Sequence, residues 1–184
     1  YVNNNVAGEY FTLSVEKKDK LISALRAKNF AMLDDNANID VINGTAKFID
    51  KNSVEVAAAD GSKSVLTAPT IVINTGSVNE KPSFEVSSNL AYDSTGILNL
   101  KTLPKRLAVV GGGYIGLEFA SMFAEFGSKV TVVARSGVLK NEDDDVRESV
   151  KTLLQTQGIE ILEGCEVKNL KDGTLNFTQN GEAK

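Results

Sequence analysis

The sequence has no histidine among its 184 residues and a single cysteine, Cys165. Histidine is the side chain that most often moves protons near neutral pH, so its absence excludes a Ser-His or Cys-His nucleophile within this chain. A lone cysteine also excludes an internal disulfide, a CxxC redox pair and a cluster of soft metal ligands. We therefore expect no catalytic residue and no metal site here, and chemistry that belongs to a bound cofactor.

Excess positive charge and long apolar runs are missing as well. The net charge is -4 and the pI is about 5.0, so no basic surface is available to replace the counterions of a nucleic acid. No apolar run approaches the roughly 18 residues that cross a bilayer, and the opening YVNNNVAGEYF does not resemble a signal peptide. The sequence predicts no nucleic-acid partner, no membrane contact and a cytoplasmic location.

The first half of the chain changes its hydrophobic period near residue 40. Residues 15–34 have apolar side chains at helical spacing, which predicts a helix. IDVINGTAKFID, SVEVAAA and SKSVLTAPTIVINTG are rich in β-branched residues and predict three antiparallel strands, with a turn at Asp60-Gly61 in which both residues have positive φ. Residues 76–97 have little periodicity and predict a linker.

The second half alternates strand and helix patterns. LAVV, KVTVV and IEIL predict buried strands, and the two segments between them predict helices that end at Gly127 and Gly158. The expected apolar face of the second helix contains Val146, Val150, Leu153 and Leu154. A last hairpin is expected at Asp172-Gly173. The predicted fold class is therefore α/β, a Rossmann-type unit with a parallel sheet and crossover helices, beside a helix and a β-meander.

The stretch VVGGGYIGLEFA, residues 109–120, places a GxGxxG pattern between the first strand and its helix. Gly111 allows the tight turn, Gly113 allows a diphosphate to approach the main chain, and Gly116 allows the helix to pack closely on the sheet. Gly112 fills a variable position. Free N–H groups and the helix dipole would hold the anion, so no lysine is needed. The candidate cofactor-binding residues of this turn are Gly111, Gly112, Gly113, Tyr114, Ile115 and Gly116.

The second strand ends in VVARSGVLK, about 20 residues beyond the glycines, where an acidic residue would bind the ribose of NAD. Ala134 stands there instead, and Arg135, Ser136 and Lys140 could bind a 2′-phosphate. NADP is therefore favoured, while NAD remains open because Arg135 and Lys140 could also be solvated loop residues. A methyltransferase that uses S-adenosylmethionine on a similar turn is an alternative, although it usually has an acid at position 134.

These motifs, with INTGS at 73–77 and YDSTGILNLKTLP at 92–104, resemble the class I pyridine nucleotide-disulfide oxidoreductases, and bacterial mercuric reductases in particular. The resemblance implies that residues 1–95 form part of an FAD-binding domain and that residues 96–184 form an NAD(P)-binding Rossmann domain, truncated at its C-terminal end. It implies FAD as a second cofactor. Hydride would pass from the nicotinamide to FAD and on to a cysteine pair and a disulfide-type acceptor, in a protein that is a homodimer when intact.

The resemblance also assigns residues outside the glycine turn. Thr75, Gly76 and Ser77 match the segment that passes FAD, and Ala46 matches a position near the adenine of the flavin. Tyr114 matches an aromatic residue that covers the flavin until the nicotinamide displaces it, and Glu118 matches a carboxylate beside the nicotinamide. Without the resemblance, Tyr114 could be a surface aromatic residue, and Glu118 could interact only with the helix dipole.

The chain departs from the family in what it omits. It has no GxGxxG turn for FAD and no CxxxxC pair, so we expect an internal fragment that is inactive alone. Cys165 matches no redox position and is expected to be a small buried residue. A non-catalytic dinucleotide-binding redox sensor is the other interpretation. The INTGS segment and the meander favour the flavoprotein.

Overall fold

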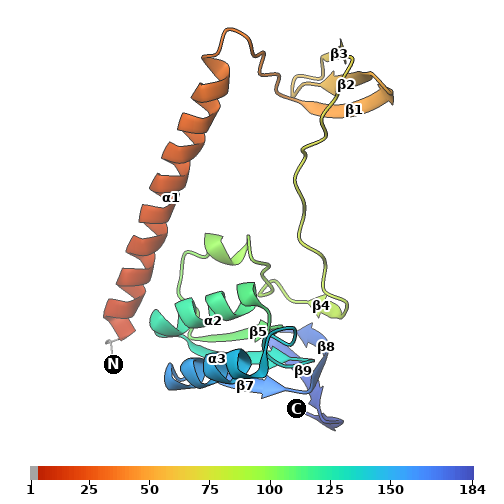
Figure 1. Cartoon of the computed structure of the whole chain (residues 1–184). Coiled ribbons are helices and arrows are strands. Elements are labelled where there is room, and N and C mark those ends of the chain that lie inside the picture. Colours follow the sequence, from red (N-terminus) through yellow and green to blue (C-terminus); the bar gives the residue numbers. More distant parts are fainter. Residues whose placement is uncertain (1–3) are drawn as a thin grey trace. The chain divides into compact units, whose positions relative to one another are not determined.

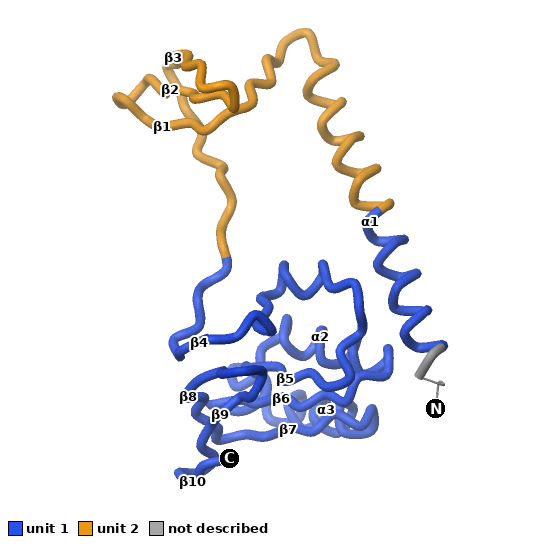
Figure 2. Tube along the Cα trace, turned by 180° about the vertical axis from the view of Figure 1, so that it is seen from behind, with its two compact units in different colours: residues 1–19, 79–184 blue, residues 20–78 orange. Residues whose placement is uncertain are grey.

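The computed structural model describes residues 4–184 and divides the chain into two compact units. One unit comprises Tyr1–Asp19 and Asn79–Lys184, and the other comprises Lys20–Val78, as the two colours in Figure 2 show. The expected boundary between the cofactor domains, at 95/96, coincides with neither of these limits. Compactness does not reveal which cofactor a segment binds, so the assignment of 1–95 and 96–184 to FAD and NAD(P) stays a prediction.

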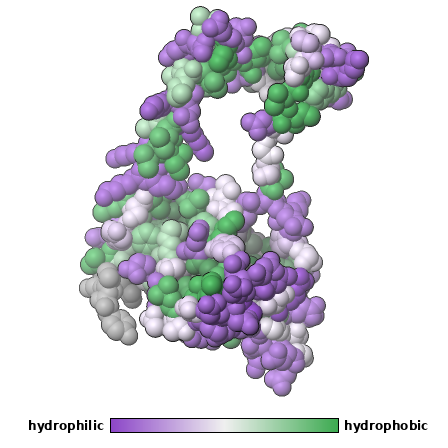
Figure 3. Space-filling view, viewed as in Figure 1, coloured by the Kyte–Doolittle hydropathy of each residue, from purple (hydrophilic) through white to green (hydrophobic). Residues whose placement is uncertain are grey.

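Helix α1 spans Asn4–Asp34 and begins 11 residues before the start that the periodicity predicted, at residue 15. Its first part is fixed by tertiary packing, because Phe11 is only 3% exposed and lies edge-on to Phe126, with ring centroids 5.2 Å apart. The apolar side chains expected on one face of its second part stay largely exposed, Leu21 at 60% and Phe30 at 46%. Figure 3 shows hydrophobic and hydrophilic residues interspersed along this helix.

The unit Lys20–Val78 contains the predicted antiparallel meander. Its strands are β1 (Thr45–Asp50), β2 (Ser53–Ala57) and β3 (Lys63–Thr67), in the order β1-β2-β3. The third strand is shorter than predicted, and the segment that contains Pro69 and Ile73 has no regular structure. The turn also differs, because only Gly61 has positive φ. The Asp60 carboxylate instead accepts hydrogen bonds from the backbone N–H and hydroxyl of Ser62, at 2.9 and 2.6 Å.

The Rossmann-type unit forms as predicted. Strands β5 (Arg106–Val110), β6 (Lys129–Ala134) and β7 (Glu160–Glu163) are parallel in the order β5-β6-β7, and along the chain they alternate with helices α2 (Tyr114–Glu125) and α3 (Asp144–Thr156). Figure 2 labels all five elements, and Figure 1 shows the two helices as coiled ribbons. Gly127 and Gly158 have positive φ just after the two helices, as C′ glycines do. The core contains side chains of the sheet, of α2, of α3 and of the first part of α1, and its most completely buried side chains include Phe123, Val130, Val132 and Val138.

The predicted apolar face of α3 is only partly buried. Leu154 is 4% exposed and Val150 packs against the core, as expected. Val146 and Leu153 are 44% and 58% exposed, so their assignment to the buried face was wrong. The buried stripe of α3 is therefore narrower than the hydrophobic pattern predicted.

A second sheet of the same unit has the order β10-β9-β8-β4. Strands β8 (Cys165–Lys171) and β9 (Thr174–Gln179) form the predicted hairpin, with Asp172 and Gly173 both at positive φ, and β10 (Glu182–Ala183) completes it. The linker predicted for 76–97 was wrong in part, because β4 (Glu85–Ser87) pairs in parallel with β8. The short 3₁₀ helix η1 (Ile97–Asn99) precedes β5. None of the helices in 4–184 is both long and apolar enough for a membrane span.

Candidate functional site

The glycine turn joins β5 to α2 and exposes its backbone at one point. Gly111 has φ of 114°, which few residues other than glycine adopt, and its N–H donates to the carbonyl of Val133 at 2.9 Å. Gly113 is the N-cap of α2 and offers no side chain to cap the helix. A Cβ placed on Gly113 would meet no heavy atom within 4 Å. The backbone at the start of α2 is therefore open on the side where a side chain of residue 113 would lie, and an anion-binding turn requires such an opening.

Two other glycines allow close packing behind the turn. A Cβ on Gly116 would lie 2.9 Å from the Gly111 carbonyl oxygen and 3.2 Å from Val109 Cγ1, which is the close approach of helix and strand that the pattern predicted. A Cβ on Gly112 would lie 2.6 Å from the Gly137 carbonyl oxygen and 2.9 Å from Val138 Cα. Close packing therefore requires a glycine at position 112. The GxGxxG pattern leaves this position variable and did not predict that role.

The loop after β6 lies against this turn. Ala134 is buried at the end of the strand, whereas Arg135, Ser136 and Lys140 are exposed. Neither basic side chain forms a salt bridge within the part of the chain that the structure describes. The backbone N–H of Leu139 donates to the carbonyl of Gly112 at 2.8 Å, and this bond joins the loop to the glycine turn.

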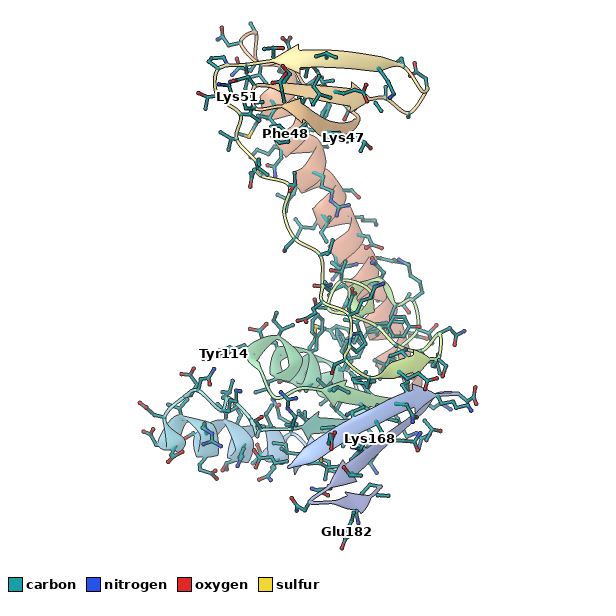
Figure 4. All side chains as sticks on the ribbon, turned by 90° about the vertical axis from the view of Figure 1, so that its right-hand side faces the viewer. Lys47, Phe48, Lys51, Tyr114, Lys168 and Glu182 are labelled. Atoms are coloured by element: carbon teal, nitrogen blue, oxygen red, sulfur yellow. The ribbon has the colours of Figure 1, made fainter. Side chains whose placement is uncertain are left out.

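Tyr114 and Glu118 occupy the first turns of α2, and Figure 4 labels Tyr114 at the start of this helix. The Tyr114 side chain is 61% exposed, and its hydroxyl donates a hydrogen bond to the carboxylate of Glu142. This bond, together with desolvation and the negative charge of Glu142, raises the pKa of the Tyr114 phenol above its usual 10.0. Glu118 is exposed, and Ile115 is 60% exposed rather than packed on the sheet.

Glu163, at the end of β7, was not anticipated from the sequence. Its carboxylate accepts a hydrogen bond from the N–H of Val138 at 2.8 Å and forms a salt bridge with Lys151 at 2.8 Å. Arg147 Nε donates to the carbonyl of Val138 at 3.2 Å. Burial alone would raise the pKa of Glu163, but the bonds from Lys151 and Val138, with the charges of Lys151 and Arg147, lower it below the usual 4.5. The sequence does contain one signal for this contact. An acidic residue ends β7, and α3 has two basic residues, Arg147 and Lys151, spaced by four positions.

The residues assigned to FAD lie in the other unit. Ala46 is exposed on β1, and Thr75, Gly76 and Ser77 are exposed in a segment without regular structure. Gly76 has φ of 73°, and a Cβ there would meet nothing within 4 Å. The sequence has no second GxGxxG turn, and the assignment of these four residues to a flavin site stays a prediction.

Cys165 begins β8 and is 2% exposed, so the prediction of a small buried residue is confirmed. Its thiol lies 3.6 Å from the carbonyl oxygen of Glu163, and burial raises the pKa of the thiol above its usual 9.0. Over residues 4–184, no three His, Cys, Asp or Glu side chains gather in a way that could hold a metal ion.

Comparison with known proteins places this chain in a family. A match to the pyridine nucleotide-disulphide oxidoreductases covers residues 2–183. The chain belongs to this family. It is 43% identical over 163 residues to a probable pyridine nucleotide-disulfide oxidoreductase, RclA, of Escherichia coli K12, and 39% identical over 181 residues to a mercuric reductase of Lysinibacillus sphaericus. These alignments cover 87% and 97% of this chain.

Solved structures agree with this assignment. The copper(II) complex of the HOCl-induced flavoprotein disulfide reductase RclA from Escherichia coli aligns with 95% of the chain at a TM-score of 0.87 and 37% identity. The mixed α/β architecture is therefore that of flavoprotein disulfide reductases. The chain spans 37% of the length of the RclA sequence, 31% of the mercuric reductase and 40% of the RclA chain in the solved structure.

Proposed function

We propose that the turn Gly111–Gly116 and the loop 134–140 bind a nicotinamide dinucleotide, with its diphosphate on the main-chain N–H groups at the start of α2. The observation that carries this proposal is the contrast among the glycines. Gly112 and Gly116 leave no room for a Cβ on the packed side, whereas Gly113 faces open space. An accessible backbone at a helix N-terminus binds an anion through N–H groups and the helix dipole.

NADP is the proposed form of the dinucleotide. Ala134 is buried at the end of β6 and has no carboxylate to repel a 2′-phosphate. Arg135, Ser136 and Lys140 follow on the exposed loop. An arginine there can donate charge-assisted hydrogen bonds to a phosphate, which the ribose of NAD lacks. NAD would bind the same diphosphate site more weakly.

For the whole protein, we propose an FAD-dependent NAD(P)H:disulfide oxidoreductase that works as a homodimer in the cytoplasm. A bound nicotinamide supplies a hydride, and FAD and a cysteine pair would relay its electrons to a disulfide-type acceptor. Tyr114 and Glu118 would position the nicotinamide, and neither needs to act as an acid or base. The single cysteine of this chain is buried, so the chain alone should not reduce a disulfide.

Calorimetric titration of the chain with NADPH, NADH and S-adenosylmethionine tests this proposal. We expect NADPH to bind more tightly than NADH, and S-adenosylmethionine not to bind. Tight binding of S-adenosylmethionine alone would replace the proposal with a methyl-transfer site. If NADH bound more tightly than NADPH, the diphosphate site would stand and the assignment of Arg135 would not.

A further inference from the structure

We propose that Glu163 is a positioning residue of the dinucleotide site, on which it acts through three peptide groups: Gly137–Val138, Val138–Leu139 and Gly112–Gly113. This inference rests on the proposed function, because it assumes that the Gly113 N–H binds the diphosphate. Glu163 lies at the end of β7, paired with Ala134 of β6, and the glycine turn follows β5. Its effect on binding must therefore be transmitted by the backbone of residues 137–139.

The first step joins Glu163 to Val138. The Val138 N–H donates to the Glu163 carboxylate at 2.8 Å, and Lys151 holds the other carboxylate oxygen at 2.8 Å. Gly137 permits this approach, because a Cβ there would lie 2.9 Å from the Glu163 oxygen. Val138 is fully buried, so its N–H has no water to replace the carboxylate.

The second step joins Val138 to the glycine turn. The carbonyl of Val138 accepts from Arg147 Nε at 3.2 Å, and the same peptide group carries the N–H of Leu139. That N–H donates to the Gly112 carbonyl at 2.8 Å. Leu139 has φ of 45°, a conformation that a leucine rarely adopts without surrounding support. Bonds on both sides of Val138 supply this support.

The third step joins Gly112 to the proposed ligand. The Gly112 carbonyl and the Gly113 N–H belong to one planar trans peptide, so they point in opposite directions. When Leu139 fixes the carbonyl on the loop side, the Gly113 N–H is aimed away from the loop. The chain of hydrogen bonds from the Arg147 cation also polarises this N–H toward an anion. Glu163 thus orients a donor that it does not touch.

The direction in which a Glu163 substitution changes cofactor affinity distinguishes positioning from a direct electrostatic effect. Glu163 is an anion near a site proposed for an anionic ligand. Removing its charge should by Coulomb's law strengthen binding. Loss of positioning should instead weaken binding. It should do so equally for NADPH and NADH, because both carry the diphosphate.

The experiment is calorimetry of NADPH and NADH binding to the wild-type chain, Glu163→Ala, Glu163→Gln and the control Glu160→Ala. Glu160 is on the same strand, but its carboxylate bonds with Thr131 and not with the loop. We expect Glu163→Ala to weaken the binding of both cofactors about tenfold, because a factor of this size corresponds to the loss of one hydrogen bond to a charged group. Glu163→Gln should recover part of the affinity, because its amide oxygen can still accept from Val138, and Glu160→Ala should bind like the wild type.

Amide hydrogen exchange supplies a local measurement that separates a shifted loop from a destabilised unit. In Glu163→Ala we expect faster exchange at Val138 and Leu139 while the β6 amides stay protected. Binding by Glu163→Ala as tight as by Glu160→Ala would overturn the proposal. Equal losses in Glu163→Ala and Glu163→Gln would also overturn it, because the effect would not follow the Val138 bond. A wild-type chain that binds neither cofactor would reject the proposed function instead.

Discussion

Gly113→Ala and Gly116→Ala should separate ligand binding from folding. Gly113 has φ of -85° and ψ of 172°, which alanine adopts without strain, and its Cβ would meet no protein atom. The substitution should therefore leave the free energy of unfolding unchanged or raise it by about 0.4–1 kcal/mol, by restricting the unfolded chain. The same methyl group would occupy the space through which a diphosphate reaches the N–H groups.

Gly116→Ala should instead destabilise the fold. Its Cβ would lie 2.9 Å from the Gly111 carbonyl oxygen, a backbone atom that cannot move without distorting the turn. Overpacking of this kind costs about 1–3 kcal/mol, and the better helix propensity of alanine returns about 0.5–1 kcal/mol. We expect Gly116→Ala to lower the free energy of unfolding by roughly 0.5–2 kcal/mol.

Urea denaturation and calorimetric titration with NADPH measure the two quantities. Loss of hydrogen bonds to the charged diphosphate should weaken NADPH binding by Gly113→Ala about 10- to 100-fold. Gly8→Ala is the matched control, because Gly8 is also open to solvent but lies in α1. If Gly113→Ala bound NADPH as tightly as Gly8→Ala, the diphosphate could not lie on this turn and the reasoning would be refuted.

Three further predictions concern charge. Arg135→Glu should weaken NADPH binding far more than NADH binding in calorimetry, and equal losses would remove Arg135 from the site. The Tyr114 pKa should lie above 10.0 and fall toward that value in Glu142→Gln. Tyrosinate absorbance measures it, with Tyr114→Phe as the reference that lacks this phenol. An unchanged pKa in Glu142→Gln would mean that the two side chains do not interact in solution. Because the Glu163 pKa is lowered, its stabilising effect should be present above pH 4.5 and disappear as the pH falls through the folded-state pKa. Urea denaturation of the wild type and Glu163→Gln should show this convergence, and a stability difference independent of pH would contradict it.

Local sequence signals predicted the elements whose interactions are close in sequence. The hairpin at Asp172-Gly173 depends on two adjacent residues with positive φ, and the ends of α2 and α3 depend on single glycines. The order β5-β6-β7 follows from right-handed crossovers between parallel strands. Each of these features needs only a short window of sequence, so pattern and turn chemistry were sufficient.

Features that depend on distant contacts were missed. Strand β4 lies in a polar segment, and it forms because β8, about 80 residues later, offers an unpaired edge. The start of α1 depends on Phe11 packing against Phe123 of α2 and against Phe126, the residue that follows α2. Neither partner can be identified from the periodicity of the segment itself.

The candidate site shows the same division. The roles of Gly111 and Gly116 follow from the spacing of the motif, and the structure has the turn and the close packing that they predict. The packing of Gly112 against Gly137 and the contact of Glu163 with Val138 join three strand ends that are far apart in sequence. Those contacts could be predicted only from the arrangement of the strands in the sheet, and the glycine motif does not specify that arrangement.

The most direct test of the account is a crystal structure of this chain with NADPH. We predict diphosphate oxygens within hydrogen-bonding distance of the backbone N–H groups of Gly113 and Tyr114, with the 2′-phosphate beside Arg135. A diphosphate bound elsewhere, or a glycine turn whose N–H groups are occupied by another part of the protein, would contradict the account.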